Sequence, residues 1–173
     1  MRYLKAAALA AAALLALSGC QQPKTDVAAF DAKSKKDVRD WIAAFNAGDV
    51  DKVVAFYAPD AVVMAPGTPS AAGHDAIRAL VQKESDALRS AGLTFAVNDD
   101  DTADASGHLG WHSGSYVVKD ATGAVVDSGN YMEVQKNIDG KWLIVRDIWN
   151  SDRPPPAPAA TEETAAEAEA PPS

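Results

Sequence analysis

The side chains best suited to chemistry lie near the end of the chain, where Asp147 stands two residues before Trp149 in the run VRDIWNSD. A second carboxylate, Glu133, belongs to the preceding segment of alternating apolar and polar residues. Two carboxylates that lie close together in an apolar pocket repel each other and are poorly solvated, which raises the pKa of at least one of them. Such a group could exchange protons near neutral pH or donate a hydrogen bond to a ligand.

The sequence leaves three roles open for Asp147. It could act with Glu133 as a catalytic acid or base, it could contact a ligand, or it could accept a hydrogen bond from a buried backbone N–H or aromatic O–H and support the fold. The aromatic residues of the neighbouring segments would then form either plain core or the lining of a pocket. The pocket residues that we expect are Trp41, Phe45, Met64, Trp111, Tyr131, Glu133, Asp147 and Trp149.

A hairpin of two strands, 124–135 and 141–150, must position these carboxylates, because both segments alternate with a period of two around the turn 137–140. A three-residue loop with Gly140 in the left-handed region would pair Tyr131 with Asp147 and Glu133 with Val145. A two-residue turn would change this pairing. The three-residue loop predicts one face with Tyr131, Glu133, Leu143, Val145, Asp147 and Trp149, and an opposite face with Met132, Val134, Trp142, Ile144 and Ile148.

Helices precede these strands. The capping-box pattern of Ser34 and Asp37 predicts a first helix with Val38, Trp41, Ile42 and Phe45 on one face, which Gly48 ends. Asp49 can cap a second helix that presents Val50, Val53, Val54 and Tyr57 and ends at Pro59. A strand at 61–65, a third helix at about 74–91 and strands at 93–98 and 109–119 complete the pattern. This order predicts an α+β domain.

The N-terminal segment predicts export and lipid attachment. Arg2 and Lys5 precede the uncharged run 6–17, and twelve apolar residues are too few to cross a hydrocarbon core of about 30 Å. The sequence LSGC ending at Cys20 resembles the lipobox of bacterial lipoproteins, which implies cleavage after residue 19 and lipidation of Cys20. By the same resemblance, Gln21 favours the outer membrane. We therefore expect a periplasm-facing protein of the bacterial cell envelope, held by the lipid on Cys20.

Composition divides the chain into a signal peptide (1–19), a lipidated cysteine and tether (20–33), one domain (34–152) and a disordered tail rich in Pro, Ala and Glu (153–173). Cys20 is the only cysteine, which excludes a disulfide and a cysteine metal cluster. Loss of Arg2 and Lys5 with the signal peptide would take the net charge from −8 to −10. Such an acidic protein is not expected to bind nucleic acid.

Other polar clusters predict neither a metal site nor a cofactor. His108 and His112 are four residues apart on a strand, about 13 Å, which is too far to share one metal ion. We expect both histidines at the surface or at the pocket rim, and His74 at the start of a helix. The run Asn98 to Asp101 lacks the glycine and glutamate of a calcium loop and predicts a solvated turn.

Three segments carry a family resemblance: FNAGDVDKVVAFYAPDAVVMAPG (45–67), GHDAIRAL (73–80) and DGKWLIVRDIWNSD (139–152). In this order they resemble the SnoaL-like group of the nuclear transport factor 2-like superfamily, to which ketosteroid isomerase belongs. The resemblance implies a cone-shaped fold, with a curved, mostly antiparallel sheet wrapped around three helices and a pocket inside. It also implies a homodimer through the outer sheet face, which a monomer at micromolar concentration would contradict.

Matched to ketosteroid isomerase, this chain lacks part of the catalytic set. The position of the general base falls at Ala65, that of the oxyanion-hole tyrosine at Trp41, and that of the oxyanion-hole acid near Glu133. Without a base we expect no isomerase activity of that type. We expect instead a protein that binds a small hydrophobic molecule and needs no cofactor. Two alternatives are an isomerase, cyclase or hydrolyase that uses Asp147 or Glu133, and a dimeric protein-interaction module.

Overall fold

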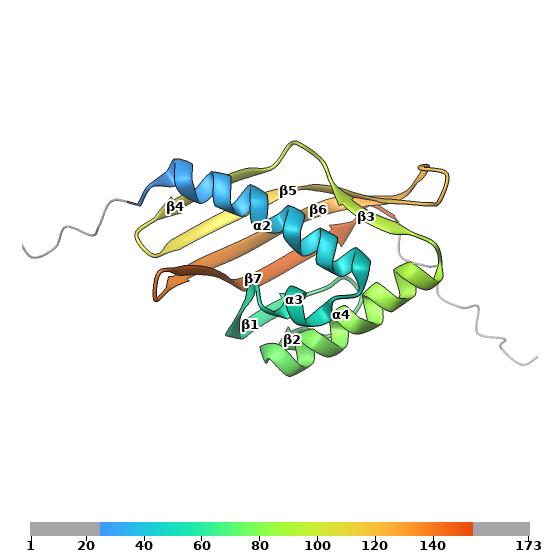
Figure 1. The fold of residues 1–173 in the computed structure, drawn as a ribbon, viewed down its shortest axis with the longest axis horizontal. Coiled ribbons are helices and arrows are strands. Elements are labelled where there is room, and N and C mark those ends of the chain that lie inside the picture. The colour runs from blue at the N-terminus through green and yellow to red at the C-terminus, as the bar shows by residue number, and fades with distance from the viewer. Residues whose placement is uncertain (1–24, 154–173) are drawn as a thin grey trace, which may run out of the picture.

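In the computed structural model, the described residues 25–153 form three helices and one curved sheet of seven strands (Figure 1). The sheet order is β2-β1-β7-β6-β5-β3, with β4 also paired to β5, and only β1 and β7 run parallel. The predicted α+β class and mostly antiparallel curved sheet are confirmed. The elements are α2 (Val27–Ala47), α3 (Val50–Val54), β1 (Tyr57–Met64), β2 (Ala71–Ala72), α4 (Gly73–Ser90), β3 (Thr94–Val97), β4 (Thr102–Ser106), β5 (Leu109–Lys119), β6 (Val125–Ile138) and β7 (Lys141–Ser151).

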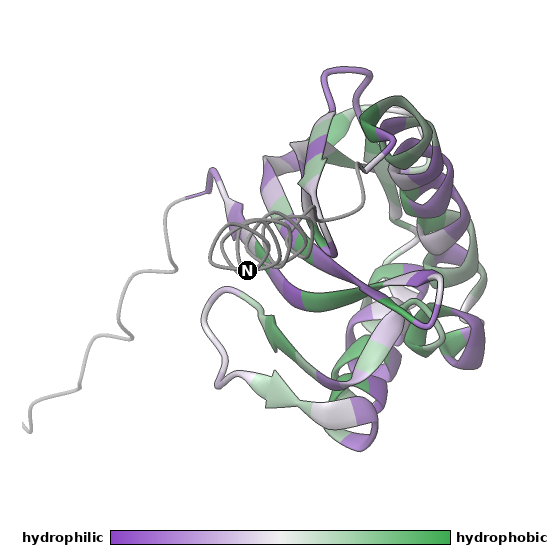
Figure 2. Ribbon diagram, turned by 90° about the vertical axis from the view of Figure 1, so that its left-hand side faces the viewer, coloured by the Kyte–Doolittle hydropathy of each residue, from purple (hydrophilic) through white to green (hydrophobic). Residues whose placement is uncertain are grey.

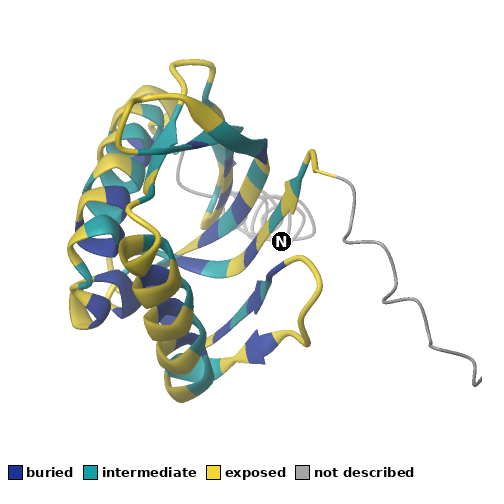
Figure 3. Ribbon diagram, turned by 90° about the vertical axis from the view of Figure 1, so that its right-hand side faces the viewer, coloured by how far each residue is buried: buried dark blue, intermediate teal, exposed yellow. Residues whose placement is uncertain are grey.

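The core lies between the helices and one face of the sheet. Figure 3 shows α2 and α4 on the same side of the curved sheet, with the buried residues of helices and strands facing each other. The apolar periodicity of the helices places Phe45, Ile77 and Val81 toward the strands, where they pack with Tyr57 and Ile144. The sheet therefore wraps around the helices as the family resemblance implied.

The first helix begins eight residues earlier than predicted, because its N-cap is Asp26 rather than Ser34. Asp26 is its N-cap and accepts a hydrogen bond from the Ala29 N–H, whereas Ser34 is fully buried inside the helix. The capping-box interpretation of Ser34 is therefore wrong, and residues 27–33 are helix rather than tether. Phe30 explains the extension, because its ring is buried against Trp142 and fills the space above Gly110. Phe30 is the only residue of this segment with a large apolar side chain in the core, and a single such residue cannot show the periodicity of a helix.

The second helix is shorter than predicted. Val50, Val53 and Val54 are buried as expected, but α3 ends at Val54 and Tyr57 begins β1. Pro59 does not end a helix; it lies within β1, where the register against β7 shifts between Tyr57 and Val62. A proline is tolerated at such an irregularity because its missing N–H leaves no ladder hydrogen bond unmade. This shift brings Tyr57 to the sheet, where its side chain becomes part of the site.

The hairpin between β6 and β7 differs from the predicted register. Its turn has two residues, Asp139 and Gly140, both with positive φ (52° and 83°), and Ile138 pairs with Lys141. A bulge then shifts the register between Val134 and Gln135, so that Glu133 pairs with Asp147 and Tyr131 with Trp149. The predicted pairs of Tyr131 with Asp147 and Glu133 with Val145 are therefore wrong.

The bulge also changes which side chains of β7 face the helices. Trp142 and Ile144, which were predicted on the outer face, line the inner face instead, and Leu143 and Val145 pack against the core without reaching the cavity. The prediction that Tyr131, Glu133, Asp147 and Trp149 share a face is confirmed, because all four lie around one cavity.

The outer sheet face carries exposed apolar side chains. Trp111 on β5, Met132 on β6 and Ile148 on β7 are 39%, 47% and 46% exposed. Figure 2 shows how apolar and polar residues alternate along the strands of the sheet. The expected homodimer through this face stays a prediction. No helix within residues 25–153 is both long and apolar enough to cross a membrane. The predicted signal peptide, Cys20 and nearly all of the acidic tail lie outside the described residues.

Candidate functional site

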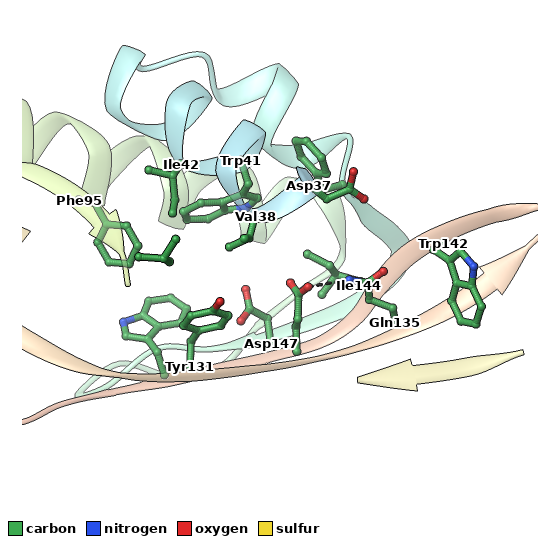
Figure 4. Close-up of a pocket in the computed structure, with 14 residues that line it drawn as sticks. Asp37, Val38, Trp41, Ile42, Phe95, Tyr131, Gln135, Trp142, Ile144 and Asp147 are labelled. Atoms are coloured by element: carbon green, nitrogen blue, oxygen red, sulfur yellow. Dashed lines mark hydrogen bonds between the residues drawn. The ribbon is translucent and has the colours of Figure 1, made fainter. Parts of the chain in front are cut away.

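A cavity of about 60 Å³ lies between α2 and the inner face of the sheet (Figure 4). Helix α2 places Val38, Trp41 and Ile42 on one side of it, at the i, i+3, i+4 spacing of a single helix face. Trp41 stacks on the buried ring of Phe45 at 5.0 Å, which fixes the indole over the sheet. The complete lining is Asp37, Val38, Trp41, Ile42, Phe56, Phe95, Val97, Tyr131, Glu133, Gln135, Trp142, Ile144, Asp147 and Trp149.

Glu133 and Asp147 form a pair of carboxylates on the strand side of the cavity. They are direct cross-strand partners on β6 and β7, so their side chains leave the same face of the sheet about 5 Å apart. Both are buried, and Figure 4 shows the Asp147 carboxylate directed toward the space beneath α2. The predicted closeness of the two acids is therefore correct, although it arises from a different register.

Asp147 is the carboxyl group with the most perturbed environment. Burial raises its pKa to about 7, the neighbouring charge of Glu133 adds to this, and a hydrogen bond from Tyr57 opposes it. The Tyr57 hydroxyl donates to Asp147 Oδ2 at 2.6 Å. Burial and the nearby carboxylates raise the pKa of Tyr57 well above its usual range, so this phenol remains a donor. Asp147 can therefore take up or release a proton near neutral pH.

Glu133 is held by a second set of partners. His112 is fully buried, with Nδ1 3.2 Å from Glu133 Oε1 and Nε2 3.0 Å from Asp101 Oδ2. Burial lowers the pKa of His112, but the hydrogen bonds and charges of Glu133 and Asp101 outweigh this, and the pKa is raised. Because both ring nitrogens face carboxylate oxygens, both carry hydrogen and the imidazolium form is favoured. Gln135 Nε2 also donates to Glu133 Oε1, at 2.6 Å.

Three polar atoms of the cavity lining are buried without a hydrogen-bond partner among the described residues: Trp41 Nε1, Tyr131 Oη and Gln135 Oε1. The Trp41 indole lies near enough to lower the pKa of Tyr57, yet it forms no hydrogen bond of normal geometry. Buried polar groups in folded proteins are nearly always satisfied, so each exception points to function or to an additional molecule. All three border the same cavity.

The structure places the predicted pocket residues in two groups. Five line the cavity: Trp41, Tyr131, Glu133, Asp147 and Trp149. Phe45 is core behind Trp41, and Met64 on β1 is only partly buried and lies outside the lining. Trp111 was expected inside and lies on the outer face, because it pairs with Val134, whose side chain is opposite to that of Glu133.

Several residues of the site were not predicted. His112 was expected at the surface or pocket rim, but it pairs with Ala103 on β4 and Glu133 on β6 and is enclosed between them. The predicted solvated turn at 98–101 is also wrong for Asp101, whose side chain is only 10% exposed and bonds His112. Tyr57 was missed because it was expected in a helix, and Gln135 was missed because it was not assigned to either face of its strand. Only the register of β5 against β6 could have revealed His112.

Comparison with known proteins agrees with this architecture. The profile of the SnoaL-like domain matches residues 38–144, whereas no curated protein matches the chain. Similar solved structures include a nuclear transport factor 2-like protein of unknown function from Pseudomonas putida KT2440, at 15% identity over 74% of this chain and 89% of that chain, with a TM-score of 0.64. A ketosteroid isomerase-like protein from Erwinia carotovora atroseptica SCRI1043 is 20% identical over 69% and 94% of the chains, with a TM-score of 0.51.

At such identities the similar structures show the fold alone. The match to the family profile carries more weight, because it spans more than half of the chain and includes the second half of α2, all of α3 and α4, and most of the sheet. Because of that match, the chain belongs to the SnoaL-like domain family.

Proposed function

We propose that the domain binds a small, largely apolar molecule in the cavity beneath α2 and holds its polar group at Asp147 and Glu133. The observation that carries the proposal is a pair of buried carboxylates that face a cavity lined by six aromatic side chains. A few polar groups set among apolar and aromatic side chains are typical of small-molecule sites. A buried carboxylate whose pKa is about 7 is typical of a functional group rather than of plain core.

Filling the cavity tests this proposal. In Val38→Phe, a phenyl ring added to the cavity face of α2 is expected to weaken binding of benzyl alcohol at least tenfold. Ala43→Phe adds the same ring to the exposed face of the same helix and should leave binding unchanged. Binding is measured by quenching of tryptophan fluorescence, since Trp41 and Trp149 line the cavity. Equal affinity of the two variants would contradict the proposal.

A second candidate function is catalysis by an isomerase, cyclase or hydrolyase of the SnoaL-like type. Asp147 favours it, because an acid–base catalyst works best when its pKa is near the operating pH. Ketosteroid isomerisation itself is not proposed: Ala65 stands at the matched base position, and the Trp41 indole cannot titrate. Turnover of a hydrophobic carbonyl compound that is lost in Asp147→Asn, with binding retained, would establish catalysis.

The proposal includes a place in the cell envelope. We propose that a lipid on Cys20 anchors the domain to the outer membrane, facing the periplasm, on the strength of the apolar run 6–17 and the LSGC sequence that follows it. Buried acyl chains contribute about 0.8 kcal/mol per methylene to membrane binding. Cys20→Ala is therefore expected to move the protein from the membrane fraction to the soluble fraction, whereas Gln22→Ala should remain membrane-bound. A Cys20→Ala protein that stays with the membrane would contradict lipid anchoring.

A further inference from the structure

Every charged side chain in the cavity lining is acidic: Asp37, Glu133 and Asp147. Two of these carboxylates already have a cationic partner, since Asp37 pairs with Lys33 and Glu133 with His112. Asp147 is the third, and its hydrogen-bond partner among the described side chains is the neutral hydroxyl of Tyr57. No lysine or arginine within residues 25–153 lines the cavity. The cavity therefore has one acidic position for which the described part of the chain supplies no counter-charge.

Gln135 adds a neutral acceptor to the same cavity. Its Nε2 donates to Glu133 Oε1, so the orientation of the amide is fixed and Oε1 is the atom left without a partner. The side chain is 2% exposed, so bulk water does not satisfy this oxygen. Gln135 and Glu133 lie two residues apart on the inner face of β6, and Asp147 is opposite Glu133. One face of the sheet thus presents three acceptor groups at neighbouring positions.

Aromatic rings surround these acceptors. Trp41 is stacked on Phe45 through one face, and Figure 4 shows the indole above Tyr131 and Asp147 with the cavity between them. Phe95 and Trp149 also line the cavity. The face of an aromatic ring attracts a cation, most strongly for tryptophan and when water is excluded. Carboxylates and rings together favour a positively charged group over a neutral or negative one.

We propose that the cavity is selective for a primary ammonium group carried on a small hydrophobic body. Its N–H donors match the carboxylate oxygens of Asp147 and Glu133, and its charge supplies the counter-charge that Asp147 lacks. This inference rests on the proposed function and names its ligand class. The rival ligand is a neutral hydroxyl or carbonyl compound, which Tyr131 and Trp41 could hold as donors. That ligand would leave the charge of Asp147 uncompensated.

Binding of the amine should depend on pH, because the ammonium pairs with the ionised form of Asp147. The titratable groups around Asp147 are Tyr57 on β1, Glu133 and Tyr131 on β6 and, farther away, Glu84 on α4. Asp37 on α2 lines the same cavity but is paired with Lys33, and His112 on β5 lies outside the lining and is bonded to Glu133. Because the pKa of Asp147 is about 7, its ionised fraction, which is the form that pairs with an ammonium, rises from about a tenth at pH 6 to about nine tenths at pH 8. Amine affinity should rise about tenfold over this range.

The test compares probes of nearly the same shape on the full chain by isothermal titration calorimetry at pH 6 and pH 8. Benzylamine is cationic at both values, benzyl alcohol is neutral and benzoate is anionic. At pH 8 we expect benzylamine to bind at least tenfold more tightly than benzyl alcohol, and benzoate not to bind. The affinity of benzyl alcohol should not rise with pH. These comparisons use the wild-type chain, so they do not depend on the folding of a variant.

Two variants test whether Asp147 is the carboxylate that pairs with the ammonium group. Asp147→Asn should lower benzylamine affinity at pH 8 at least tenfold and remove most of its pH dependence. Asp60→Asn is the matched control, because it removes the same charge from an exposed position on β1 and should change neither probe. Equal or tighter binding of benzyl alcohol by the wild-type chain would overturn the ammonium preference but leave the proposed function standing. Absence of binding by all three probes would overturn both.

Discussion

Asp147→Asn is expected to stabilise the domain at pH 8, raising the free energy of unfolding by roughly 1–3 kcal/mol. Asn keeps an oxygen that can accept the Tyr57 hydrogen bond, and it removes a buried charge that lies opposite Glu133. Its amide N–H can also donate to Glu133, where the wild-type carboxylate repels. A stability gain from the loss of a native side chain would mean that Asp147 is retained for function at a cost in stability.

The sign of the pH dependence follows from the direction of the pKa shift. Asp147 has a pKa of about 7 in the folded domain and about 3.9 in an unfolded chain, so the folded state holds the proton more tightly. The stability that comes from this proton is fully present below about pH 4 and is lost as pH rises through 7. The advantage of Asp147→Asn over the wild type should therefore be small at pH 4, grow between pH 4 and 7, and level off above 7.

Urea unfolding of both proteins at pH 4, 5, 6, 7 and 8 measures this difference. His112 also has a raised pKa and changes stability in the same sense, but it is present in both proteins, so most of its contribution cancels in the comparison. Asp60→Asn, at an exposed position, should differ from the wild type by less than about 0.5 kcal/mol. A loss of about 1–3 kcal/mol in Asp147→Asn at pH 8 would instead make the carboxylate a structural partner of Tyr57. The search for the working residue would then move to Glu133.

Local sequence signals predicted most of the fold. The bounds of β5 agree with the prediction at both ends, and the apolar face of α2 at Val38, Trp41 and Ile42 lines the cavity as its helical spacing implied. The errors lie where a difference of one residue, in a turn or at a bulge, changes the face of the sheet on which a side chain lies. A two-residue turn and one bulge in the β6–β7 hairpin placed Trp142 and Ile144 on the inner face. Neither the turn length nor the bulge leaves a periodic signal in a single strand.

The site could be predicted only in part for a related reason. Glu133 and Asp147 lie on adjacent strands joined by a short turn, so a local argument brought them together. His112 and Asp101 come from β5 and from the segment before β4, and their contact with Glu133 depends on pairings among three strands. The surrounding run of glycine and serine in β5 has no apolar alternation that would mark an inner face. Tertiary pairing, rather than propensity, determines this part of the site.

His112→Gln is expected to lower the free energy of unfolding by about 3–5 kcal/mol at pH 7, because removing one member of a buried charged cluster leaves the others uncompensated. The imidazolium is fully buried between Asp101 and Glu133, and a glutamine can satisfy only part of their hydrogen bonding. Because the pKa of His112 is raised, its stabilisation is full below about pH 6.5 and is lost as pH rises through its folded value. The destabilisation should therefore be smaller at pH 9 than at pH 6. His108→Gln, an exposed histidine four residues away, should change stability by less than about 0.5 kcal/mol.

A double-mutant cycle with Glu133→Gln separates the charge of His112 from its packing. If the cost of His112→Gln comes from leaving Glu133 unpaired, the double variant should recover roughly 1–3 kcal/mol of it. Additive losses would mean that the imidazole acts through shape alone.

The same variants report on the cavity, because an unpaired Glu133 repels Asp147 more strongly. The pKa of Asp147, followed by carboxyl NMR, should rise further in His112→Gln and fall in Glu133→Gln. Shifts of the Asp147 pKa in opposite directions in the two variants would show that His112 influences the protonation of Asp147 through Glu133. An unchanged pKa of Asp147 would mean that the role of His112 is structural.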